Sequence, residues 1–355
     1  MRPLLVTAAG FLAVTALLAG VLRFDLLRGD ALGYWNDSLD WQHPFNPFHV
    51  PLYPMALALL RGVTLGAASP LILMAAVNLG SLLAGVVFVR ELLLATGEEG
   101  GAAELGALLY AFWPFVGIVF AASLQAEVPA MALFLGGLLA LQRERRPLGG
   151  LLLGLAAVTH KALWPFAGLV VLAETLTRGT GGVRRGASLL AFVLAPLSLL
   201  WAAGLAAGHP LDWLVATNLR NEVASRGRIP FLDGLVGTLL RGDPKSLAKG
   251  LFVAGLAAGA ATLLVLALRR RYPSWRNGAA VAASVLFLAF ALNQWEIWAT
   301  VRFSRLLALP LIWTFGAAAG NGLSRFAAPG RFALLSFLFF TQLVWAWYMA
   351  KVYFG

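Results

Sequence analysis

Long apolar runs separated by short polar turns extend through the whole chain. A run of about 20 apolar residues is long enough to cross the hydrocarbon core of a bilayer as a helix. The pattern therefore predicts an all-α polytopic membrane protein whose chain lies mostly within the bilayer. The apolar runs fall at 4–22, 69–89, 103–122, 126–142, 187–207, 250–268, 278–295, 303–320 and 332–350.

Two segments depart from this simple pattern. Residues 51–66 are too short to span a bilayer and contain Arg61, so they are interpreted as an amphipathic helix lying along the membrane interface. Residues 147–176 are apolar except around His160 and Lys161, and arginines flank them on both sides. Because basic residues of short loops gather in the cytoplasm, this segment must cross an even number of times. We expect two short limbs, with His160 and Lys161 at a turn that lines a cavity.

Composition supports the membrane assignment and excludes other classes of protein. Hydrophobic residues make up 60% of the chain and charged residues 12%, with a mean hydropathy of +0.81. Ordinary soluble domains carry about 25% charged residues. A soluble enzyme, a disordered chain and a nucleic-acid-binding domain are therefore excluded. The chain has no cysteine, which also excludes disulfides and thiolate metal sites.

Charge gives the predicted helices an orientation. The net charge is +11, from 27 basic and 16 acidic residues. With the arginine-rich loops in the cytoplasm, the chain makes about eleven crossings, with its N-terminus inside and its C-terminus outside. Arginine greatly outnumbers lysine, which is typical of a GC-rich bacterium. We therefore expect the bacterial cytoplasmic (inner) membrane.

A single membrane-embedded domain is expected over 1–355, with no separate soluble domain. Its first external loop covers 23–68. A long external loop, 208–249, has the length and polarity of either a mobile flap over a pocket or a plain surface loop. The first run, 4–22, has the length of a spanning helix and exceeds the apolar core of a signal peptide.

Polar side chains gather in the predicted external loops. Residues 23–50 include several aspartates and two histidines, a tight second loop places Glu127 at the start of a helix, and Lys161 lies at the hairpin turn. A hydrated loop, a carboxylate that stabilises a helix N-terminus and a lysine that reaches the interface would explain these residues without any chemistry. Position alone does not distinguish between Asp25 and Asp30 as a reactive group.

Short motifs on this side place a charged residue or a histidine beside an apolar segment. They follow one another along the chain in a fixed order. The motifs are Gly29-Asp30-Ala31-Leu32-Gly33-Tyr34, His49-Val50-Pro51-Leu52-Tyr53-Pro54, Ala126-Glu127-Val128-Pro129, Gly154-Leu155-Ala156-Ala157-Val158-Thr159-His160-Lys161, and Arg302-Phe303-Ser304-Arg305 through Pro310.

In order and placement these motifs resemble the GT-C superfamily of membrane glycosyltransferases, nearest to its protein O-mannosyltransferase and aminoarabinose-transferase branch. The resemblance covers most of the chain and is strongest over 20–175. It implies a GT-C-like fold with interfacial helices in the first external loop. It also implies transfer of a sugar from a polyprenyl-phosphate carrier to an acceptor hydroxyl on the extracytoplasmic side, with inversion at the sugar carbon.

Some positions depart from the family pattern. Ala31 follows the aspartate where the family often has glutamate, and Glu127 stands where many members have aspartate. His160 separates Thr159 from Lys161, which the family places together.

The resemblance and the demands of the reaction together assign roles. The attacking hydroxyl must lose a proton, so a carboxylate has to act as general base, and the family pattern selects Asp30 from among Asp25, Asp30 and Asp37. Glu127 is the second catalytic candidate. It either holds a divalent cation together with Asp30 or orients and tunes the base. The sequence leaves a divalent cation as an open alternative and indicates no other cofactor. Contacts to the substrate, above all to the donor phosphate, are expected from Tyr34, His49, Tyr53, His160, Lys161, Arg302 and Arg305.

A secondary transporter or lipid flippase is the alternative interpretation. Transporters place polar groups near the bilayer midplane on broken, repeated helices. Here the charged residues gather at the outer face, and midspan positions are nearly all apolar. A non-catalytic assembly protein, or a polymerase or ligase of surface glycans, is a further alternative. As a transferase, the chain would have as partners a polyprenyl-phosphate sugar donor, a lipid, glycan or protein acceptor and membrane lipids, and no nucleic acid.

Overall fold

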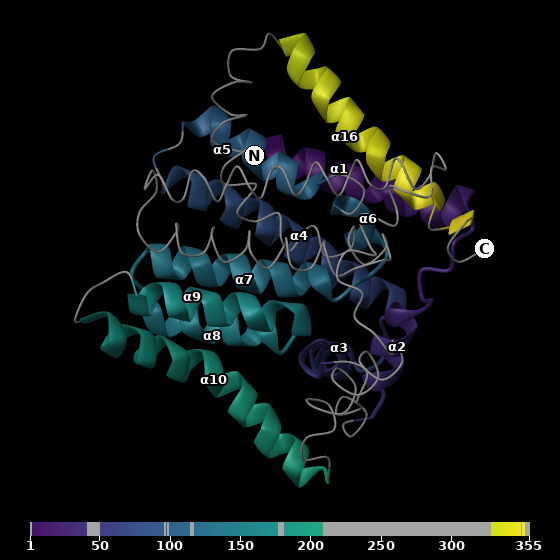
Figure 1. Cartoon of the computed structure of the whole chain (residues 1–355). Coiled ribbons are helices and arrows are strands. Elements are labelled where there is room, and N and C mark those ends of the chain that lie inside the picture. The colour runs from purple at the N-terminus through teal and green to yellow at the C-terminus, as the bar shows by residue number, and fades with distance from the viewer. Residues whose placement is uncertain are drawn as a thin grey trace, which may run out of the picture.

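The computed structural model is helical throughout the part of the chain that it describes, with no strand there (Figure 1). The described residues are 2–40, 50–95, 97, 99–113, 117–176, 181–208, 328–348 and 350–351.

Four helices within the described residues are long and apolar enough to cross a membrane. They match the apolar runs predicted at the corresponding positions, whereas the three runs between 250 and 320 lie outside the described residues. The protein is therefore an all-helical, membrane-embedded chain. The four helices are α1 (Arg2–Ala16) with its π-helical continuation η1 (Leu17–Val21), α4 (Pro70–Leu94), α10 (Gly182–Ala206) and α16 (Ala328–Tyr348).

The run predicted as one helix over 103–122 is instead two helices, α5 (Gly100–Ala111) and α6 (Gly117–Ala122). Pro114 in the sequence explains the interruption, because proline lacks an amide hydrogen and keeps the preceding residue out of the helical region. The prediction of a single spanning helix was wrong here because it counted apolar residues and gave no weight to the proline.

A side chain from α16 compensates for this break. The Nε2 of Gln342 donates to the Trp113 carbonyl at 2.7 Å, and its Oε1 accepts from the Val119 amide at 3.5 Å. Gln342 is fully buried. A broken helix in an apolar environment needs partners for its freed backbone groups, and Gln342 provides them from the far end of the sequence.

The hairpin predicted over 147–176 is confirmed as two short helices. α8 (Arg146–Ala157) ends just before His160, the short 3₁₀ turn η3 (Lys161–Leu163) follows, and α9 (Trp164–Leu176) runs back. The Trp164 indole Nε1 donates to the Ala157 carbonyl at 2.7 Å and closes the turn. His160 and Lys161 thus lie at the turn, as the flanking arginines predicted.

Two short helices of the first loop lie together at one end of the bundle (Figure 1). α2 (Asp30–Asp37) and α3 (Leu52–Val63) pack on each other, and α3 also packs on α4. The short helix predicted over 51–66 is confirmed as α3, and it has one buried side: Tyr53 and Leu57 face inward, whereas Leu59 is exposed.

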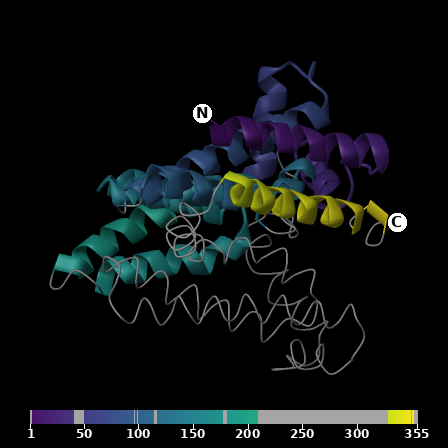
Figure 2. The same ribbon diagram turned by 90° about the horizontal axis from the view of Figure 1, so that it is seen from above.

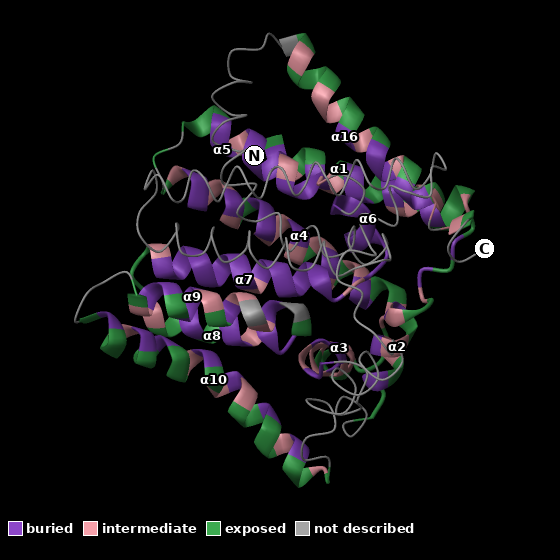
Figure 3. Ribbon diagram, in the orientation of Figure 1, coloured by how far each residue is buried: buried purple, intermediate pink, exposed green. Residues whose placement is uncertain are grey.

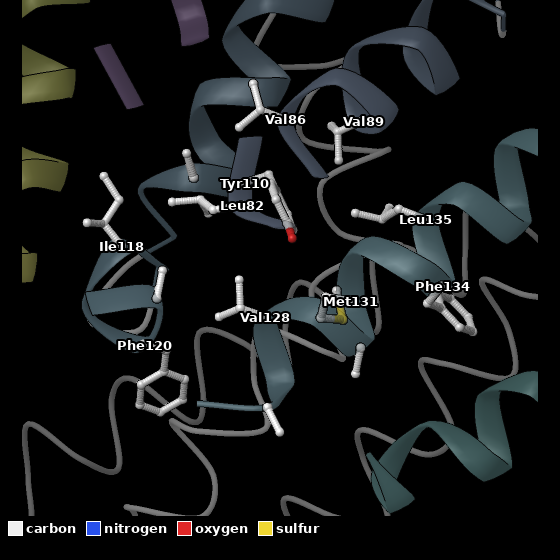
Figure 4. Packing of buried hydrophobic residues seen from close by; sticks show 14 of the residues in the cluster. Leu82, Val86, Val89, Tyr110, Ile118, Phe120, Val128, Met131, Phe134 and Leu135 are labelled. Carbon is white, nitrogen blue, oxygen red and sulfur yellow. The ribbon is translucent and has the colours of Figure 1, made fainter. Parts of the chain in front are cut away.

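α7 (Glu127–Gln142) is the central helix of the described bundle, and nearly all of its residues are buried (Figure 3). It packs between α4 and α8, while α10 covers α8 and α9. α16 lies along α1 and contacts α6 (Figure 2). Figure 4 shows side chains of this core, with Tyr110 between Val86 and Met131. Gly85 makes room for that ring, because a Cβ there would lie 2.6 Å from the Tyr110 hydroxyl oxygen.

Glycines allow α8 and α10 to approach closely. A Cβ on Gly150 would lie 2.6 Å from the Phe192 Cβ, and a Cβ on Gly154 would collide with the Val193 carbonyl oxygen. These are the two glycines that a small-xxx-small motif on this segment predicts to lie at a helix contact. The close contact holds one limb of the hairpin against α10.

We predict that Gly154→Ala lowers the thermal unfolding midpoint of the detergent-solubilised chain, because the new methyl group must push α10 away from α8. The expected loss is about 1–3 kcal/mol of unfolding free energy. Gly168→Ala on α9 is the matched control, because its Cβ would meet no described atom within 4 Å. That variant should gain up to about 1 kcal/mol from helix propensity. Equal effects of the two substitutions would contradict the close packing.

Candidate functional site

Several helix ends meet where α2 and α3 lie. The amide of Leu52 at the start of α3 donates to the Val158 carbonyl at 3.2 Å, which joins α3 to the turn between α8 and α9. Val50, Val158 and Leu200 form an apolar cluster beside this contact. The start of α3, the hairpin turn and the C-terminal part of α10 are therefore fixed to one another.

A buried carboxylate and a buried imidazole lie side by side at this end. The Glu127 Oε1 is 3.6 Å from the His160 Nε2, and the two side chains are 2% and 8% exposed. Glu127 begins α7, where the helix dipole favours a negative charge. The contact becomes an ion pair when His160 is protonated. The structure thus brings together two residues that the sequence placed in separate motifs.

The turn before Glu127 holds a strained backbone. Leu124 has a φ of 62° and ends α6 in a Schellman motif, in which its amide bonds to Ala121 and the Gln125 amide bonds to Phe120. A branched apolar residue in this conformation costs about 1–2 kcal/mol. The Leu124 side chain is buried in the core, which offsets this cost and fixes the direction in which α7 starts.

Tyr53 is bonded to α4. Its hydroxyl oxygen accepts a hydrogen bond from the Asn78 Nδ2 at 2.8 Å, and both residues are buried. Burial raises the pKa of the Tyr53 phenol well above its usual range, the Asn78 hydrogen bond lowers it, and the Glu127 carboxylate raises it further. Tyr53 is therefore a neutral hydroxyl within the electrostatic reach of Glu127.

Asp30 is connected to this cluster by α2, which also carries Tyr34. The Tyr34 and Tyr53 rings meet edge to face with centroids 5.1 Å apart. Tyr34 lies one helical turn after Asp30, so both are on the same face of α2. Gly29 precedes them with φ 58° and ψ −130°, a conformation that suits glycine alone. Asp30 is half-buried, in contrast to the fully buried Glu127.

Other predicted site residues are less closely involved in this cluster. Lys161 is exposed at the hairpin turn, next in sequence to His160. Within the described residues, no group of three or more histidine and carboxylate side chains could hold a metal ion. His49, Arg302 and Arg305, together with the long loop 208–249 except its first residue, lie outside the described residues.

The opposite end of the bundle has a different charge pattern. Glu91 near the end of α4 pairs with Arg90 at 2.8 Å and with Arg143 at the end of α7 at 3.1 Å. The start of α8 adds Arg145 and Arg146. Arginines thus gather at one end of α7 and the buried Glu127 begins the other.

Asn78 is a site residue that the sequence analysis missed. A signal was present, because Asn78 is a polar residue in the middle of the apolar run 69–89. Polar side chains inside a predicted membrane helix are uncommon and usually bond to a neighbouring helix. Asn78 was missed because the midspan positions were treated as nearly all apolar.

The chain matches no protein-family model, no curated protein and no solved structure. The site is therefore interpreted from its own geometry.

We predict that Glu127 and His160 are energetically coupled. Removing one member of a buried pair leaves the other uncompensated, so Glu127→Gln and His160→Gln should each destabilise the chain. The double variant should lose less than the sum, with a coupling of about 1–3 kcal/mol in denaturant unfolding in detergent.

The exposed pair of Glu91 and Arg143 is the control for this cycle. Their side chains are 31% and 52% exposed, so Glu91→Gln and Arg143→Gln should couple by less than about 1 kcal/mol. Additive effects of Glu127→Gln and His160→Gln would show that the buried contact contributes nothing specific.

Proposed function

We propose that the protein is a GT-C type integral-membrane glycosyltransferase that moves a sugar from a polyprenyl-phosphate carrier to an acceptor hydroxyl, with inversion. The observation that carries the proposal is the cluster formed by Asp30, Tyr34, Tyr53, Glu127 and His160. These residues come from four motifs of the family resemblance, and the fold brings them to one end of the bundle.

Burial supports a division of roles between the two carboxylates. Asp30 is half-buried at the start of α2, so an acceptor hydroxyl can approach it and lose its proton to it. Glu127 is almost fully buried and is held beside His160. This placement favours a role in orienting and tuning the site over direct contact with substrate.

The donor phosphate is assigned to the hairpin turn. Lys161 is an exposed cation there, three residues before the partly buried Trp164. A lipid-linked phosphate stays at the membrane surface, and its negative charge grows as the bond to the sugar breaks. A lysine fixed near it lowers the barrier by stabilising that charge.

The polarity of the bundle supports the proposed orientation. Arginines gather at the end of α7 that lies away from the cluster. Because basic residues favour the cytoplasmic side, the site would face the opposite side of the bacterial cytoplasmic membrane, with the N-terminus inside. The proposal includes about eleven crossings and a lipid, glycan or protein as acceptor.

The break between α5 and α6 is the feature that most favours a transporter. Transporters bind their substrates at broken helices. Here the Trp113 carbonyl and the Val119 amide are already bonded to Gln342. Because Gln342 already satisfies these two backbone groups, they are not left to bind a transported substrate. We therefore favour the transferase.

We predict that Asp30→Asn abolishes transfer from a polyprenyl-phosphate sugar by the purified chain, because an amide does not accept the acceptor's proton. The rate should fall by about 10²- to 10⁴-fold. Asp25→Asn is the matched control on the same loop, since Asp25 is exposed and its Oδ1 accepts from the Leu27 amide at 3.0 Å. Near-normal turnover of Asp30→Asn would refute the assignment of the base.

We predict that Lys161→Ala raises the KM for the polyprenyl-phosphate donor by about tenfold or more, because the phosphate loses a cationic partner. Lys161→Arg keeps the charge and should retain most of the affinity. An unchanged donor KM and rate in Lys161→Ala would remove this residue from the donor site.

A further inference from the structure

Asn78 on α4 is bonded to α3, a helix of the first loop. It is fully buried, about two turns into the helix. Its Nδ2 donates to the Tyr53 hydroxyl at 2.8 Å and to the Met74 carbonyl, one turn earlier, at 3.1 Å. A buried amide with two hydrogen bonds is held in one orientation, because breaking either leaves an unsatisfied group.

The Met74 carbonyl determines which end of the Asn78 amide faces Tyr53. A carbonyl oxygen only accepts hydrogen bonds, so the amide atom beside it must be the nitrogen; an amide oxygen there would repel it. The same nitrogen faces the Tyr53 hydroxyl, which must therefore accept. The phenolic hydrogen of Tyr53 consequently points away from Asn78.

The contacts of Tyr53 place this geometry on the first loop. The Glu127 carboxylate adds to the effect of burial on the pKa of the Tyr53 phenol. The Tyr53 ring also packs edge to face on the Tyr34 ring of α2. A change in the position of the Tyr53 ring would therefore move α2.

We propose that Asn78 is a positioning residue of this site: it holds the Tyr53 hydroxyl as a hydrogen-bond acceptor, so that the phenolic hydrogen points away from α4, and through the ring contact with Tyr34 it fixes α2, which carries Asp30. The proposal deepens the proposed transferase function and rests on it only for the effect on catalysis. Its geometric part, the direction of the Tyr53 hydroxyl, stands independently.

Two substitutions of Asn78 distinguish an effect on the direction of the Tyr53 hydroxyl from an effect on side-chain packing. Asn78→Leu keeps a similar volume and removes both hydrogen bonds. Asn78→Asp keeps the shape, but an ionised carboxylate only accepts, so it should draw the phenolic hydrogen back toward α4. Thr7→Val on α1 is the matched control, because the Thr7 hydroxyl is buried and has no hydrogen-bond partner among the described residues.

The first measurement is independent of any activity. Infrared spectra of the full chain with isotope-labelled tyrosine, minus the spectrum of Tyr53→Phe, isolate the phenol C–O band of Tyr53. We expect this band to shift in Asn78→Leu, to shift differently in Asn78→Asp and to stay in place in Thr7→Val. A band that is unchanged in both Asn78 variants would overturn the proposal.

The second measurement is transfer from a polyprenyl-phosphate sugar. Asn78→Leu should lower kcat by about 10- to 100-fold, as expected when a catalytic group is displaced by about 1 Å, with the donor KM little changed. In the Tyr53→Phe background, the same substitution should have less than about a twofold further effect. Equal losses in both backgrounds would show that Asn78 acts only on stability.

The two measurements keep the proposals distinguishable. If the Tyr53 band shifts as expected but the wild-type chain transfers no sugar, the transferase function fails and the geometry stands. If the wild-type chain transfers sugar and the band does not shift, the function stands and the positioning role of Asn78 fails. Should Asn78→Leu not fold, Asn78→Asp alone decides the direction of the hydroxyl.

Discussion

The burial of a carboxylate inside an apolar bundle is the constraint on which the arrangement of the described site depends. Moving an unpaired carboxylate out of water costs many kcal/mol, so the residues around Glu127 must supply polar partners. His160 lies beside it from the hairpin turn, and Tyr53 of α3 is close enough for the carboxylate to raise the pKa of its phenol. The hairpin and the first loop therefore have to meet at the start of α7.

The backbone solves a related problem wherever a helix ends inside the bundle. At Leu124 a Schellman motif satisfies the freed carbonyls, and the π-helical turn at the end of α1 gives the Leu17 carbonyl a partner in the Leu22 amide. The end of α5 instead depends on Gln342. Each solution uses a residue of unusual conformation or position, because no water is available to bond these groups.

Much of the architecture was predictable from the order of apolar and basic residues. The flanking arginines predicted the hairpin around His160, and the spacing of Gly150 and Gly154 is typical of a close helix contact, whose partner the structure shows to be α10. The break at Pro114 could have been predicted but was missed, because apolar length received more weight than the proline. Long apolar runs are reliable indicators of helices and poor indicators of where those helices are interrupted.

The site itself was only partly predictable. The motifs indicated Asp30, Tyr34, Tyr53, Glu127 and His160 one at a time, but their contacts join residues far apart in sequence. Such contacts follow from how helices pack, which a single sequence does not reveal.

The bond between Gln342 and Trp113 also has a consequence for the order in which the protein forms. The two residues are separated by 229 positions. At a synthesis rate of about 5–20 residues per second, the end of α5 is made roughly 10–45 s before its partner. During that time the Trp113 carbonyl has the Gly117 amide as its donor, at 3.0 Å, and the bond that joins it to α16 forms only after residue 342 has been synthesised.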